Sequence, residues 1–115
     1  MKVTFLGTGT STGIPTIGVE RESCLSSDKR DKRLRSSILI EYKSKSILID
    51  CGPDFRQQML RINKTKIDAI FFTHEHADHT AGLDDIRPIS FHHGKIPIYA
   101  HKRVVDNLKN RFDYL

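Results

Sequence analysis

The stretch Thr73-His74-Glu75-His76-Ala77-Asp78-His79 decides how the rest of the chain is interpreted. It places three of the chain's six histidines within six residues, together with two carboxylates. In extended backbone, side chains two residues apart point the same way, so His74 and His76 can offer two imidazoles to one ion while Glu75 points elsewhere. Once the chain turns, Asp78 and His79 can serve a second ion nearby. Mixed imidazole and carboxylate ligands suit zinc, manganese or iron(II), and paired ions suit hydrolysis.

The helical zinc motif H-E-x-x-H is excluded for this stretch. After His74 and Glu75 it would require a second histidine at the position that Asp78 occupies. The stretch is therefore interpreted as a loop that follows a strand.

The sequence on either side predicts short strands and helices. Five runs rich in β-branched and aromatic residues are typical of strands, and they cover residues 3–6, 37–42, 46–50, 67–72 and 96–100. The second and third are close enough to form a hairpin, and Pro97 favours an edge position for the last. A helix is expected to start at residues 52–54, with Pro53 in its first turn. A second, amphipathic helix is expected near residues 104–112.

These elements indicate an α/β fold of the layered α+β kind, with residues 1–115 forming a single domain. Several strands are continuous apolar runs, which is typical of a sheet buried on both faces. Only two clear helices are available to cover it, so one face would be left as a large apolar patch. The chain is therefore expected to be part of a larger layered domain, or to bury that face in a homodimer. The sequence leaves both alternatives open.

Length, charge and cysteine content narrow the class of protein. A chain of 115 residues allows one domain or part of one. No window approaches the roughly 18 consecutive apolar residues of a membrane span, and the start is too poor in apolar residues for a signal peptide, so we expect a cytoplasmic protein with no membrane partner. The net charge of +5 favours phosphate-bearing partners, and much of it lies in residues 29–35. Cys24 and Cys51 are interpreted as reduced thiols.

The histidine-rich stretch is similar to the T-H-x-H-x-D-H signature of the metallo-β-lactamase fold superfamily of hydrolases. The segments Phe5-Leu6-Gly7-Thr8-Gly9-Thr10 and Ile47-Leu48-Ile49-Asp50-Cys51-Gly52 stand where such proteins carry their first strand and their strand-Asp-x-Gly motif. Residues 7–15, 31–37 and 82–88 resemble the PhnP group of phosphodiesterases, whose known substrate is a ribosyl cyclic phosphate. The resemblance implies the N-terminal half of an αββα sandwich.

The resemblance also implies a role for each residue of the motif. His74 and His76 would be ligands of one divalent metal ion, zinc or manganese, and Asp78 and His79 ligands of another. Asp78 would also orient the attacking water and so act in catalysis, while Asp50 would brace the histidine loop. The implied reaction is hydrolysis of a small cyclic or diester phosphate by a metal-bound hydroxide.

The sequence departs from the family pattern in two ways. Full-length relatives add a third histidine, a bridging aspartate and a further histidine from their later half, and His92, His93 and His101 come too early to fill these places. The chain is therefore expected to carry half a site and to be inactive alone. Some PhnP members hold a structural zinc through a cysteine cluster, but the corresponding stretch here has only Cys24, so that zinc is expected to be absent.

Three other functions fit parts of the sequence. The glycine-rich residues 7–15 suggest a nucleotide-binding loop, but Thr12 stands where G-x-G-x-x-G needs glycine. The tRNA 3′-processing endonucleases called tRNase Z, of the same superfamily, share the Gly-Thr-Gly opening and the histidine motif, so nucleic acid stays open as the less favoured partner. A non-catalytic remnant that keeps the fold for a partner also stays open.

Overall fold

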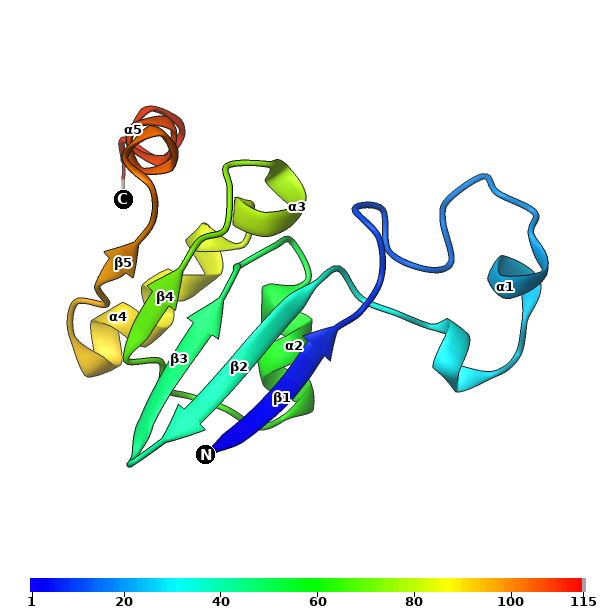
Figure 1. Cartoon of the computed structure of the whole chain (residues 1–115), viewed down its shortest axis with the longest axis horizontal. Coiled ribbons are helices and arrows are strands. Elements are labelled where there is room, and N and C mark those ends of the chain that lie inside the picture. The colour runs from blue at the N-terminus through cyan, green and yellow to red at the C-terminus, as the bar shows by residue number, and fades with distance from the viewer. Residues whose placement is uncertain (115) are drawn as a thin grey trace.

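The computed structural model describes residues 1–114, and its centre is a five-stranded mixed sheet (Figure 1). The strands lie in chain order: β1 (Lys2–Gly7), β2 (Ser37–Tyr42), β3 (Lys45–Ile49), β4 (Ala69–Phe71) and β5 (Ile98–Tyr99). The first three pair antiparallel, and β3, β4 and β5 pair parallel. All five predicted strands are confirmed, and β5 lies at an edge of the sheet, as Pro97 predicted.

Five α-helices and two 3₁₀ turns complete the described part of the chain. The helices are α1 (Glu22–Leu25), α2 (Phe55–Arg61), α3 (Ala77–Thr80), α4 (Arg87–His93) and α5 (Lys102–Arg111), and the turns cover Lys29–Asp31 and Leu83–Ile86. The final helix confirms the sequence prediction. Helix α4 was not predicted. No helix among residues 1–114 is long and apolar enough to cross a membrane.

The helix that was expected to start at residues 52–54 is α2, and Asp54 is its N-cap residue. The helix begins at Phe55, and the preceding Asp54 makes no capping bond to it. The Asp54 carboxylate instead accepts hydrogen bonds from the backbone N–H of Arg35 at 2.8 Å and from its guanidinium at 3.0 Å. A contact between residues distant in sequence has therefore replaced the local cap.

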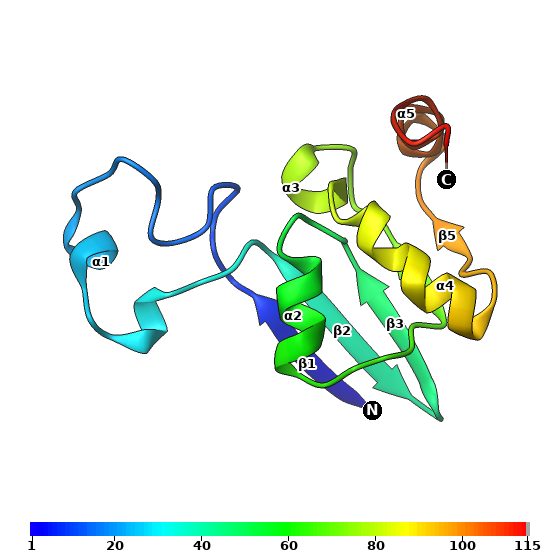
Figure 2. The same cartoon turned by 180° about the vertical axis from the view of Figure 1, so that it is seen from behind.

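Helices α2 and α4 cover the same face of the sheet (Figure 2). Each connects two parallel strands, and the strands β3, β4 and β5 advance in one direction across the sheet. Because such crossovers are right-handed, both helices must lie on one side. Between them and the sheet lies the core, which includes Leu39, Leu48, Phe55, Met59 and Ile70.

The other face of the sheet is not covered by a helix, as the small number of predicted helices indicated. Two rows of apolar side chains cross it: Phe5, Ile38, Ile49, Phe71 and Tyr99, and beside them Val3, Ile40, Ile47 and Ala69. The side chains toward the edges are well exposed, Phe5 at 64% and Tyr99 at 51%. The predicted apolar patch is therefore present.

Residues 8–36 leave the sheet between β1 and β2 and extend away from it (Figure 1). The base of this projecting segment is closed by isolated bridges that pair Gly9 with Arg35 and Ile14 with Arg33. Helix α1 and the 3₁₀ turn Lys29–Asp31 form its outer part.

Candidate functional site

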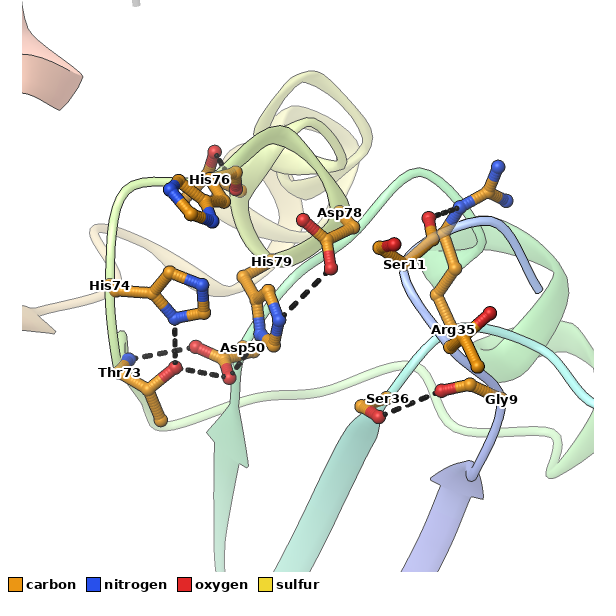
Figure 3. A network of polar contacts seen from close by, with 12 residues as sticks. Gly9, Ser11, Arg35, Ser36, Asp50, Thr73, His74, His76, Asp78 and His79 are labelled. Carbon is orange, nitrogen blue, oxygen red and sulfur yellow. Dashed lines mark hydrogen bonds and ion pairs between the residues drawn. The ribbon is translucent and has the colours of Figure 1, made fainter.

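The histidine motif lies just beyond the carboxyl end of β4 (Figure 3). Asp50 directly follows β3, the parallel neighbour of β4, so Asp50 and Thr73 leave the sheet side by side. Ligands of sheets with parallel strands bind at this end, where the loops that follow the strands converge. The strand order therefore brings two distant parts of the sequence to one place.

Asp50 is the centre of a hydrogen-bonded network. Its Oδ1 accepts from the backbone N–H of Thr73, and its Oδ2 accepts from the Thr73 hydroxyl and lies on His79 Nδ1, all at 2.8 Å. The carboxylate is only 5% exposed, so its satisfaction depends on these partners. Asp50 adopts a positive φ of 61°, a conformation that Asp tolerates better than most residues and that is common near functional sites. The predicted bracing of the histidine loop by Asp50 thus has a direct geometric counterpart.

Main-chain contacts hold α3 against the loop after β3. Cys51 N–H donates to the carbonyl of His79 at 2.8 Å, and Gly82 N–H donates to the carbonyl of Cys51 at 2.9 Å. A Cβ on Gly52 would stand 2.0 Å from the Asp78 carbonyl oxygen, and a Cβ on Gly82 would stand 2.1 Å from that of Gly52. Only glycine allows this approach of two backbones.

The histidine side chains gather on one side of the motif. The His74 ring lies 4.6 Å from that of His76 and 4.0 Å from that of His79, measured between centroids. The Thr73 hydroxyl contacts His74 Nδ1 at 2.9 Å. The expectation that His74 and His76 lie on the same side is confirmed.

His79 lies between two carboxylates. Its Nδ1 faces Asp50 at 2.8 Å, and its Nε2 faces Asp78 Oδ2 at 3.1 Å. Because a carboxylate only accepts, the Asp50 contact places the proton on Nδ1 and leaves the Nε2 lone pair facing another acceptor. Both atoms are electron-pair donors of the kind that bind a divalent metal ion.

The donor types fit a divalent metal ion. Imidazole and carboxylate suit zinc or manganese, and a histidine that donates its Nδ1 proton to a carboxylate is the usual support of a metal ligand. Among residues 1–114, no three or more His, Cys, Asp or Glu side chains are arranged as a formed metal cage. The chain therefore presents donor atoms of the right kind, in contact with one another.

Glu75 meets helix α5. Its carboxylate pairs with Arg103 at 3.2 Å, and Arg111 donates to its backbone carbonyl at 2.9 Å. The pKa of Glu75 lies below its usual value because a backbone hydrogen bond and the Arg103 charge both favour the carboxylate. Arg111 also donates to the Thr80 hydroxyl at 3.0 Å, so α5 fastens both ends of the motif loop.

These two arginines are the residues that sequence reasoning missed. Arg103 and Arg111 are 28 and 36 residues from Glu75, and nothing local distinguishes them from other charges of an amphipathic helix. Thr73 was quoted in the motif but given no role, although its hydroxyl links Asp50 to His74.

The glycine-rich loop lies beside the motif. In Figure 3, Ser11 and Arg35 stand across from Asp78. Arg35 Nε donates to the Ser11 carbonyl at 2.9 Å, and the Ser36 hydroxyl donates to the Gly9 carbonyl at 3.1 Å. Residues from both ends of the projecting segment thus border the donor cluster.

The remaining histidines are elsewhere. His92 and His93 lie in the last turn of α4 and line a groove of about 640 Å³ between α2 and α4, and His101 caps α5 by accepting from Arg103 N–H at 3.2 Å. Burial raises the pKa of the Cys51 thiol well above its usual value, so this cysteine is not prepared as a nucleophile.

Comparisons with known proteins agree with this architecture. The family model of the beta-lactamase superfamily domain matches residues 45–115. The solved structure of a diphosphatase from the PhnP family superposes with a TM-score of 0.93 and 50% identity, over 98% of this chain and 46% of that one. An octanoyltransferase of Porphyromonas gingivalis is 47% identical over 100% of this chain and 23% of its own length. A ribonuclease Z of Methanococcus maripaludis is 34% identical over 85% of this chain and 28% of its own.

The chain belongs to the beta-lactamase superfamily and has the fold of a part of a metallo-β-lactamase domain. Within that superfamily its structure is similar to the PhnP family, as the sequence resemblance indicated. The chain spans less than a third of the curated relatives named above and less than half of the solved one.

Proposed function

We propose that this protein is a metal-dependent hydrolase that cleaves a phosphodiester. His74, His76, Asp78 and His79 would hold divalent ions, zinc or manganese, and Asp50 would support them. One observation carries the proposal: the Nε2 atom of His79 and the carboxylate of Asp78 face each other at 3.1 Å, while Nδ1 is held by Asp50. Both acceptors would serve as ligands of a divalent ion.

The chain's own residues have separable roles in this reaction. When bound, the ions lower the pKa of a water toward neutrality and polarise the phosphoryl oxygen. Asp50 keeps the proton of His79 on Nδ1 and so keeps Nε2 available as a ligand. The Thr73 hydroxyl contacts His74 Nδ1 and orients that ring. Asp78 would orient the attacking water through its carboxylate.

Hydrolysis at phosphorus is favoured by two features. The chain carries a net charge of +5, which attracts phosphate esters, and it is 50% identical to a PhnP-family diphosphatase over 98% of its length. The second candidate is cleavage of RNA, which the 34% identity to a ribonuclease Z favours. Octanoyl transfer is not proposed, because the matched part is 23% of that relative and Cys51 is buried.

The donors from residues 74–79 form only part of a two-ion site, so further ligands must come from outside this chain or from a second copy. A small phosphodiester is the proposed substrate, and a homodimer is one way to complete the site.

The experiment is a metal analysis of the purified 115-residue chain after loading with zinc or manganese. We expect bound metal in the parent chain, loss of it in His76→Ala, and retention in His92→Ala, a matched change at an exposed histidine of α4. Equal metal content in all three chains, or none in the parent, overturns the metal assignment. Turnover of a ribose cyclic phosphate against precursor tRNA, measured on a preparation in which the two-ion site is complete, then separates the two substrate classes.

A further inference from the structure

A hollow of about 400 Å³ opens where the projecting segment meets the sheet. Its walls come from the end of β1, the last residue of α2 and the segment around the 3₁₀ turn Lys29–Asp31. Five cationic side chains line it: Lys29, Arg30, Lys32, Arg33 and Arg61. The sequence showed only a run of basic residues, whereas the fold adds an arginine from a helix distant in sequence.

Several of these cations are held in place by backbone carbonyl groups. Lys32 Nζ donates to the Ser26 carbonyl at 2.6 Å, and Arg33 Nε donates to the Arg30 carbonyl at 2.9 Å. Arg61 donates to the carbonyl of Leu6. An ammonium has three N–H donors and a guanidinium five, so each group keeps donors for a ligand. The cations are therefore positioned by uncharged partners that leave their charge uncompensated.

Arg30 differs from the others because it is neutralised. Its guanidinium forms a forked pair with Asp28, with the shortest contact at 2.6 Å. No carboxylate lines the hollow among the described residues, and Lys29, Lys32, Arg33 and Arg61 form no ion pair there. Four like charges around one hollow repel each other, and an anion between them relieves that repulsion.

We propose that this hollow binds a chain of phosphate groups, in the form of a nucleic-acid backbone or a free polyphosphate. The forked donors of arginine match phosphate oxygens, and lysine adds a point charge. The volume lies within the range of roughly 300–1,000 Å³ that is usual for ligand sites. Four uncompensated cations from two distant segments fit several phosphates in a row better than a single one. The site contains no metal donor and goes beyond the proposed hydrolase, because binding there needs no metal ion.

The test measures binding of a short fluorescent single-stranded oligoribonucleotide by anisotropy, with a chelator present so that metal plays no part. The test variant in the projecting segment, called the arm variant, is Lys32→Gln with Arg33→Gln. The control, Lys95→Gln with Lys109→Gln, removes the same charge from exposed lysines at the opposite end of the molecule. The main-chain bonds between Arg33 and Ile14 survive the substitution, so the projecting segment keeps its anchor. Arg61→Gln tests the same hollow from helix α2.

We expect the arm variant to bind at least about tenfold more weakly than the control. The slope of log affinity against log salt should fall by about 0.7 for each phosphate that the variant no longer neutralises. Arg61→Gln should weaken binding in the same direction. Competition by tripolyphosphate would assign the site to phosphate chains in general, and competition by oligonucleotide alone would assign it to the nucleic-acid backbone. Equal losses in arm variant and control, unchanged affinity in both, or no binding by the parent chain would overturn the proposal.

Discussion

Removal of the Asp50 carboxylate tests the central network directly. Asp50→Ala deletes the acceptor of three hydrogen bonds at 2.8 Å and leaves the Thr73 N–H and the His79 ring without their partner. Bonds to a charged acceptor contribute about 1.5–3 kcal/mol each, and relief of the buried carboxylate offsets part of that sum. We expect the free energy of unfolding to fall by about 3–5 kcal/mol, as for other broken buried charge networks.

Urea unfolding at neutral pH measures this loss, and a double-mutant cycle with Thr73→Val isolates one bond. The coupling between Asp50 and the Thr73 hydroxyl should be about 1.5 kcal/mol or more. Asp106→Ala is the matched control, since its carboxylate is 52% exposed and pairs with Lys102 on the surface, where such pairs contribute about 0–1 kcal/mol. A loss at Asp50 no larger than at Asp106, or a coupling of zero, would refute the network as described.

Three further outcomes are expected. Gly82→Ala should destabilise the fold by at least about 1–3 kcal/mol in urea unfolding, because its Cβ would stand 2.1 Å from the Gly52 carbonyl oxygen, and an unaffected midpoint would contradict the close approach. The pKa of Glu41 is lowered mainly by the hydrogen bond from Lys64. This pair therefore stabilises the protein above the unfolded pKa of the carboxyl group, and the contribution is lost as pH falls through the lower folded pKa. NMR titration should show the pKa of Glu41 rising in Lys64→Gln. The parent chain should bind a hydrophobic dye at the open sheet face, and Phe5→Lys with Phe71→Lys should reduce the signal.

The strands were predictable because each is a short β-branched run bounded by turn residues. The prediction of an open face also followed from the sequence, since the apolar runs outnumbered the helices that could cover them. Helix α4 was not predicted because Arg87–His93 carries few apolar residues and has no capping side chain. The helix directly continues the 3₁₀ turn Leu83–Ile86. A contact distant in sequence also changes the start of α2, because the carboxylate of its N-cap residue Asp54 accepts from Arg35 instead of capping the helix.

For the site, the candidate metal ligands could be predicted from the sequence, but the residues that position their loop could not. The roles of residues 74–79 could be predicted from their spacing and from the family resemblance, and that of Asp50 from the family resemblance. The contacts of Arg103 and Arg111 with Glu75 depend on where α5 packs in the fold. The apolar periodicity of a helix does not indicate which distant segment it will contact.

The contact between the loop after β3 and helix α3 has a consequence for how such a protein can diversify. Cys51, Gly52, Gly82 and the carbonyls of residues 78 and 79 meet through main-chain atoms alone. Side chains on the surrounding loops can therefore be exchanged without moving the donors, provided that both glycines stay. The backbone that positions the donors can therefore stay constant while the loops that contact substrate change. Mutational libraries for new substrates should spare these two glycines and vary the loops around them.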